Sequence, residues 1–247
     1  MTRECVAGCD RGAATERVRC TSHFRPRECH HSGLVDPREA VVRRVLDRYL
    51  VEIVEAYELC PWARAARAGG ELAVAVVWQQ PALDEWVAAA ERLLAAPRTR
   101  VAMIVAPEWS GSPAELRALR DRVAARVATA GVADFFPEAA FDLATPARLV
   151  PFLRRSPDPL LQLVPLALLD GVRAAPPPPD LAAQARMLGG AGAAPHVAVA
   201  DRIAAANHAR VAADPEAIAA RFAAIAEDRA RSYARAGIAI SASPRPR

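Results

Sequence analysis

The chain has 247 residues, 53% of them hydrophobic, and a formal net charge of +4 at pH 7. This length and apolar content suffice for one sizeable core without disulfide or metal support, and the modest, dispersed charge does not indicate a nucleic-acid partner. All 32 Lys+Arg residues are arginine, which excludes chemistry that needs a lysine amine, such as a Schiff base with pyridoxal phosphate or a phosphate-loop lysine.

The hydropathy pattern argues against a membrane protein. The longest apolar runs are residues 72–78 and 101–106, far short of the roughly 20 residues that span a bilayer. The N-terminus also lacks an apolar signal segment. We therefore expect a cytoplasmic protein with no membrane partner.

Residues 1–34 differ from the rest of the chain and show no apolar periodicity. They contain four of the five cysteines, Cys5, Cys9, Cys20 and Cys29, and three histidines, which raises the hypothesis of a zinc site. The spacing argues against it, because structural zinc sites pair their ligands in tight C-x2-C knuckles. Disulfides do not suit a cytoplasmic chain. We expect either a disordered arm or a spurious segment upstream of the true start, with no metal site assigned.

The folded region opens at Asp36 with an N-cap, a proline at the first helical position and a glutamate at the third. Apolar residues then recur at three- and four-residue steps, which predicts a long amphipathic helix over 37–60. It should end before Pro61, because a proline disfavours helical geometry in the preceding residue. Pro61 can itself open a short helix over 61–68, closed by two glycines, with Cys60 as its N-cap.

Strands and helices alternate over the next 70 or so residues. A capping box begins at Ser112, and Pro137 either breaks the third strand or places it at an edge. The expected strands cover residues 72–78, 101–106 and 132–141, and the expected helices between them residues 83–94 and 113–131.

This order predicts an α/β fold, because helical crossovers favour right-handed connections between parallel strands. We expect a small, mostly parallel or mixed sheet of three to four strands with helices packed on it, the sheet being mixed if residues 160–169 add an edge strand. The expected organisation is a main domain over 35–240 with a proline-rich loop at 174–180, C-terminal helices over 199–211 and 214–237, and a disordered tail over 241–247.

Cys60 is the single cysteine of the expected main domain. As the N-cap of a helix it would have its thiolate stabilised by free amides and by the helix dipole, which makes it a candidate catalytic nucleophile, redox centre or metal ligand. The alternative is a buried cysteine that fills space where a helix turns. Neither a C-x-x-C partner nor a neighbouring histidine accompanies it.

Arg154, Arg155 and Ser156 form the candidate ligand-binding site. They precede a Pro-Asp-Pro turn that would present two guanidiniums beside a hydroxyl, an arrangement suited to bidentate binding of carboxylate or phosphate. The alternative is the end of a helix over 146–153, where arginines complement the helix dipole.

Three carboxylates lie on or near the third strand: Asp134, Glu138 and Asp142. They could bind a hard cation or act as acid and base. Charges at strand ends are usually exposed, so we expect a solvated face instead.

Three short motifs resemble, in the same order, those of the bacterial domain-of-unknown-function family 1415. They are Leu59-Cys60-Pro61-Trp62-Ala63 after a long helix, Phe135-Phe136-Pro137 with Phe141, and Arg155-Ser156-Pro157-Asp158-Pro159, and the resemblance covers about residues 42–168. It implies no activity or cofactor, because the family has no established function.

The departures from the family pattern are informative. Where the family has Phe-His-Pro, this chain has Phe136 for the histidine; where it has Arg-Ser-Pro-Tyr-Pro and then a histidine, this chain has Asp158 and Gln162. The polar groups most suited to join Cys60 in an acid/base or metal site are therefore replaced, whereas Cys60, Arg155 and Ser156 are kept.

Two hypotheses from different classes follow. In the first, an enzyme or a binding protein holds a small anionic ligand at a site formed by Cys60 and Arg155 in a cleft at strand ends. In the second, a non-catalytic interaction or scaffold protein has kept the family fold and lost its histidines. Fold resemblance does not choose between them, because function belongs to sites.

Overall fold

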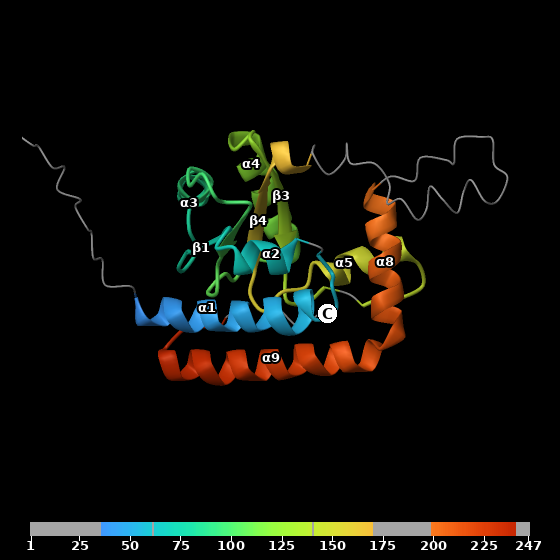
Figure 1. Cartoon of the computed structure of the whole chain (residues 1–247). Helices are drawn as coiled ribbons and strands as arrows, with labels where there is room; N and C mark the ends of the chain where they lie inside the picture. Colours follow the sequence, from blue (N-terminus) through green and yellow to red (C-terminus); the bar gives the residue numbers. More distant parts are fainter. Residues whose placement is uncertain (1–35, 61, 140, 170–198, 241–247) are drawn as a thin grey trace, which may run out of the picture. The chain divides into compact units, whose positions relative to one another are not determined.

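The computed structural model describes residues 36–60, 62–139, 141–169 and 199–240. The expectations for the arm at 1–34, the proline-rich loop at 174–180 and the tail at 241–247 lie outside these ranges. In chain order the elements are α1 (Pro37–Tyr49), the π-helix η1 (Leu50–Glu55), α2 (Ala63–Ala68), β1 (Leu72–Val76), α3 (Leu83–Leu94), β2 (Val101–Val105), α4 (Pro113–Arg126), β3 (Ala130–Phe135), α5 (Pro146–Leu153), β4 (Leu160–Pro165), α8 (Val199–Ala213) and α9 (Pro215–Ala236) (Figure 1).

The four strands form one mixed sheet in the order β1-β2-β4-β3. β1 and β2 are parallel, and β4 runs antiparallel to both β2 and β3. The predicted α/β fold with C-terminal helices is confirmed. The expectation of an edge strand at 160–169 is wrong: β4 lies inside the sheet because its leucines are buried on both faces, Leu160 in one core and Leu161 and Leu163 in the other.

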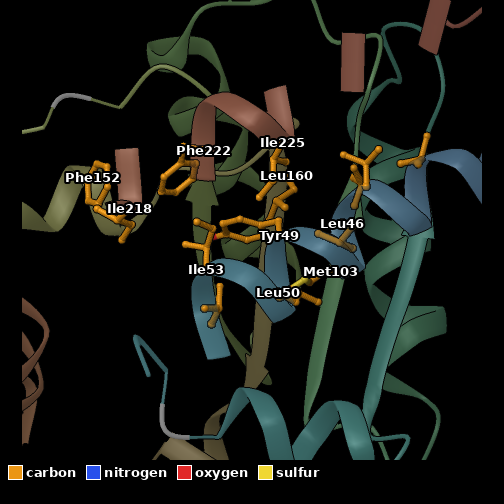
Figure 2. Packing of buried hydrophobic residues seen from close by; sticks show 14 of the residues in the cluster. Leu46, Tyr49, Leu50, Ile53, Met103, Phe152, Leu160, Ile218, Phe222 and Ile225 are labelled. Atoms are coloured by element: carbon orange, nitrogen blue, oxygen red, sulfur yellow. The ribbon is translucent and has the colours of Figure 1, made fainter. Parts of the chain in front are cut away.

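Each face of the sheet carries its own core, because successive side chains of a strand point to opposite faces. On one face, Met103 and Leu160 share a core with residues of α1, η1, α5 and α9 (Figure 2) and with Val211 of α8. On the other face, Ala102 and Ile104 pack against α3 and α4. α9 lies alongside α1 (Figure 1), so α1 is held between α9 and the sheet.

Several helix ends follow the capping signals in the sequence. The hydroxyl of Ser112 accepts a hydrogen bond from the Glu115 amide at the start of α4. α9 ends at Ala236 and is capped by Gly237, whose φ of 68° is left-handed. The prediction that Gly131 ends α4 is wrong. α4 stops at Arg126, and Gly131 pairs with Val164 inside β3.

The predicted helix over 37–60 is not a uniform α-helix. α1 changes at Leu50 into η1, and the helical segment gives way to a turn in which Glu58 has a left-handed φ of 48°. A π-helical stretch is rare and is frequently found at functional sites. Here Tyr49, Leu50 and Ile53 remain buried through the change (Figure 2). The turn that follows carries Cys60.

Within the described ranges, no helix combines the length and the apolarity that a membrane span requires.

Candidate functional site

A cavity of about 160 Å³ lies between η1, α2 and the sheet face that packs on α1. Most of its wall is apolar, and the lining residues that carry a polar side-chain group are Cys60, Tyr49 and Gln162. The lining residues are Tyr49, Leu50, Val54, Leu59, Cys60, Ala63, Ala66, Leu72, Val101, Met103, Phe135, Leu153, Leu160 and Gln162.

The local sequence explains why this space stays open. α2 turns Ala63 and Ala66 toward the cavity, and a methyl group reaches only a short way toward the sheet. The turn before α2 is held in place by Asn207 of α8, a buried residue whose amide donates a hydrogen bond to the carbonyl of Leu59 at 3.0 Å. The hydrogen bond from α8 therefore fixes the position of the cavity wall next to Cys60.

Cys60 is half-buried in this wall and is a free cysteine. It is not an N-cap: α2 begins at Ala63, and Trp62 occupies the capping position without a side-chain hydrogen bond. Burial raises the pKa of the Cys60 thiol, while the backbone amides of Trp62 and Ala63 act in the opposite direction and only partly offset it. The thiol is therefore protonated at neutral pH, which argues against an activated nucleophile.

The other two polar groups of the wall are also uncharged. Tyr49 is 4% exposed, and burial, with a smaller contribution from Cys60, raises its pKa well above the ordinary value for tyrosine. Gln162 is half-buried in β4, opposite Met103 of β2. No acidic or basic side chain belongs to the lining formed by the described residues. The side chains that line the cavity are therefore all uncharged at neutral pH.

Arg154 and Ser156 have structural partners. Arg154 is the C-cap of α5, and its Nη1 lies 3.4 Å from Oδ1 of Asp134. Asp134 is buried and also faces Arg120 at 3.6 Å, so the expected solvated face is wrong for this carboxylate: it serves as a counter-ion for arginines. Ser156 is buried and donates a hydrogen bond to the carbonyl of Asp158 at 2.6 Å, which fixes the turn.

Arg155 is different. Its guanidinium is half-buried and stacks on the ring of Phe222 at 4.9 Å. Burial lowers its pKa, and the negative charge of Glu138 opposes that effect. No carboxylate of the described residues lies within ion-pair distance of it. Arg155 is also not among the residues that line the cavity, whereas Leu153 is. The cavity that Cys60 lines therefore does not include Arg155.

Comparisons of the chain with protein-family models, with curated proteins and with solved structures found no match. The site is therefore interpreted from its own geometry. Among the described residues there is also no group of three or more His, Cys, Asp or Glu side chains placed to hold a metal ion.

Sequence reasoning missed three residues that shape the site: Tyr49, Asn207 and, as a cavity residue, Gln162. Tyr49 belongs to the apolar stripe of the first helix, where a tyrosine is indistinguishable from a core residue. Asn207 had no distinguishing signal, because its partner at Leu59 lies 148 residues away. Gln162 did carry a signal, since it stands where the family pattern has a histidine.

Proposed function

We propose that this protein binds a small, uncharged organic molecule in the cavity at Cys60. The observation that carries the proposal is the cavity of about 160 Å³ with a mostly apolar wall. An apolar cavity of about 150 Å³ in another protein takes up benzene. The size therefore suits a molecule built on one six-membered ring or a short branched chain.

The polar groups of the wall define the rest of the ligand. Gln162 offers both a donor and an acceptor, and the Tyr49 hydroxyl offers a second donor. A ring that bears one hydroxyl or carbonyl group could use them. A charged ligand would lose its hydration without gaining a counter-ion in the described wall, which is costly. Neutral ligands are therefore favoured.

The resemblance to the domain-of-unknown-function family 1415 is part of this proposal. Two of its three motifs line the cavity, through Leu59, Cys60 and Ala63 of the first and Phe135 of the second, and Gln162 follows the third motif by three residues. A family binding site would bring motif residues from separate parts of the chain together in this way. We infer a divergent member whose site has exchanged histidine for a neutral amide.

A second candidate is a small anionic ligand held by Arg155, as the motif around it suggests. The specific observation in its favour is the half-buried guanidinium with no carboxylate partner among the described residues. Buried charges are normally paired. An anion bound from solution would supply the missing charge.

Fluorine NMR of the full chain with two matched probes tests both candidates. Neutral 4-fluorophenol should bind saturably and should slow the methylthiolation of Cys60 by methyl methanethiosulfonate, read by mass spectrometry of the Cys60 peptide. Saturable binding of 4-fluorobenzoate that disappears in Arg155→Met would favour the second candidate.

Variants show where the probe binds. Ala66→Leu should fill the cavity and weaken 4-fluorophenol by at least about tenfold, whereas Ala223→Leu, on the exposed side of α9, should leave it unchanged. Gln162→Leu should weaken 4-fluorophenol more than fluorobenzene, because only the phenol uses the amide. If neither 4-fluorophenol nor fluorobenzene binds, the neutral-ligand proposal fails. If 4-fluorobenzoate does not bind either, the non-catalytic scaffold hypothesis is favoured.

A further inference from the structure

A second hollow lies at the opposite end of α1 from Cys60. It is an open groove of about 400 Å³ between the first two turns of α1 and the last turn of α9, within the size range of small-molecule sites. Its lining residues are Pro37, Arg38, Val41, Arg44, Ser232, Arg235 and Ala236.

The groove is lined by basic side chains. Three of its seven lining residues are arginines and none is acidic. The carboxylates nearby pair with the arginines without lining the groove: Asp36 accepts hydrogen bonds from the Arg38 guanidinium, and Asp228 pairs with Arg44. The start of α1 adds little, because Asp36 already accepts the hydrogen bonds of the first free amides. Arg38 also lies 3.8 Å from Glu108. Among the described residues, Arg235 is therefore the lining arginine whose positive charge has no carboxylate within ion-pair distance.

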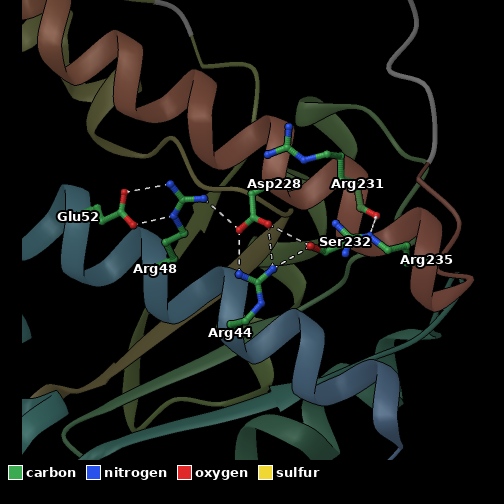
Figure 3. A network of polar contacts seen from close by, with 7 residues as sticks. All are labelled: Arg44, Arg48, Glu52, Asp228, Arg231, Ser232 and Arg235. Atoms are coloured by element: carbon green, nitrogen blue, oxygen red, sulfur yellow. Dashed lines mark hydrogen bonds and ion pairs between the residues drawn. The ribbon is translucent and has the colours of Figure 1, made fainter.

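Two of these guanidiniums are held in fixed positions. Arg44 spans both oxygens of Asp228, at 2.8 and 3.1 Å, and also donates a hydrogen bond to the Ser232 hydroxyl at 2.8 Å (Figure 3). Arg38 lies over the ring of Trp78 at 4.3 Å. Donors that are already oriented lose little entropy when a ligand binds.

Arg235 supplies the available donors. It is exposed, its Nε donates a hydrogen bond to the carbonyl of Arg231 at 3.3 Å (Figure 3), and no carboxylate of the described residues lies within ion-pair distance of it. Asp228 is shared by Arg44 and Arg48. Arg44 donates hydrogen bonds through its two terminal nitrogens and Arg235 through its Nε. Among the described residues, the Nε of Arg44 and the terminal nitrogens of Arg235 therefore remain available to a ligand.

We propose that this groove binds the phosphate group of a small phosphorylated molecule. Arginine forks bind both carboxylates and phosphates. A phosphate dianion offers oxygens in several directions and can meet guanidiniums from two helices, whereas a carboxylate presents its two oxygens in one plane. Pro37, Val41 and Ala236 provide apolar wall for the organic part of the ligand. This site is separate from the cavity at Cys60.

Isothermal titration of the full chain with pyrophosphate tests the proposal, at constant ionic strength and with malonate as the dicarboxylate comparison. Pyrophosphate should bind saturably and at least tenfold more tightly than malonate. Arg235→Ala should weaken it by about tenfold, as expected for lost charged hydrogen bonds. Arg231→Ala, a change at another exposed arginine of the same helix that does not line the groove, should stay within twofold of the parent.

The outcomes are decisive in each direction. Absence of saturation up to about 10 mM pyrophosphate overturns the proposal, as does an equal loss in Arg231→Ala, which would mark non-specific attraction. Equal affinity for malonate overturns the phosphate class. Both substitutions are at exposed positions, and circular dichroism of each variant checks that it remains folded.

Discussion

The hydroxyl of Tyr233 lies 2.6 Å from Oδ2 of Asp158, and the guanidinium Nε of Arg229 lies 2.7 Å from the other oxygen of the same carboxylate. Asp158 and Tyr233 are buried, and Arg229 is only 13% exposed. Burial raises the pKa of Asp158, while Arg229 and Tyr233 oppose that effect. This buried cluster ties α9 to the turn that leads into β4.

Asp158→Asn should be strongly destabilising, because it leaves the guanidinium of Arg229 with little solvent and no counter-ion. Breaking one side of a buried pair typically lowers the free energy of unfolding by about 3–5 kcal/mol, whereas Tyr233→Phe, which removes one hydrogen bond, should lower it by about 1–2 kcal/mol. Urea denaturation measures both, with exposed Arg231→Ala as the control. An Asp158→Asn variant as stable as the parent would show that the pair is not formed in solution.

The hydrogen bonds and ion pairs of Asp228 predict that the contact between α1 and α9 contributes less to stability at low pH. Hydrogen bonds from Arg44, and secondarily from Arg48 and Ser232, hold the pKa of this carboxyl well below its usual range in the folded protein, although burial acts in the opposite direction (Figure 3). A lowered folded pKa means that the contribution is fully present above the unfolded value near 3.9 and is lost as the pH falls toward the folded value.

The measurement compares parent and Asp228→Asn by urea denaturation between pH 7 and pH 2. The stability difference should be about 1–3 kcal/mol at pH 7, stay constant down to about pH 5 and shrink below about pH 4. Asp84→Asn serves as the matched control, because the carboxylate of Asp84 is 85% exposed. A difference that stays constant down to pH 2 would contradict the prediction.

Patterns that depend on neighbouring residues predicted much of this fold. The capping box at Ser112 and the helices expected over 83–94 and 214–237 each depend on residues close together in the sequence, and the structure has α4, α3 and α9 at these places. The position of β4 could not be predicted this way, because it depends on pairing with β2 and β3. Its run of buried leucines is compatible with an interior strand, but periodicity does not identify a strand's neighbours.

The candidate site was harder to predict for the same reason. Cys60 stood out as the single cysteine of its region, but its environment depends on Gln162 and Tyr49, which the fold brings to it from other elements. The N-cap hypothesis failed because the turn after η1 delays α2 until Ala63. The environment of a thiol follows from long-range packing, which residue spacing alone does not encode.

Two substitutions test whether the half-buried charge of Arg155 lowers the stability of the folded protein. Arg155→Met keeps an unbranched apolar chain against Phe222 and removes the half-buried guanidinium, so the free energy of unfolding should be unchanged or rise by up to about 1 kcal/mol. Arg155→Ala should instead lower it by about 1 kcal/mol, because both the packing and the cation–π contact are lost. Thermal and urea denaturation distinguish the two. A loss above about 2 kcal/mol in Arg155→Met would show that the charge is paired in solution.

The thiol of Cys60 should react slowly at neutral pH. Because burial raises its pKa, more than the nearby amides lower it, the thiolate population at pH 7 is smaller than in a free cysteine, whose pKa is about 8.5. The rate of alkylation by iodoacetamide should therefore continue to rise above pH 9. Mass spectrometry of the tryptic peptide over 49–64, in which Cys60 is the one cysteine, follows this residue separately from the others.

The same peptide in urea-unfolded chain provides the reference, because unfolding exposes the thiol and returns its pKa to the ordinary value. The folded protein should react more slowly at every pH, with its midpoint displaced upward. An apparent pKa below about 8 in the folded chain would reverse the conclusion, since it would require a thiolate stabilised by a positive charge or by amides beyond those of Trp62 and Ala63. Cys60 would then be a nucleophile candidate, and the neutral-ligand proposal would have to give way to thiol chemistry in the same cavity.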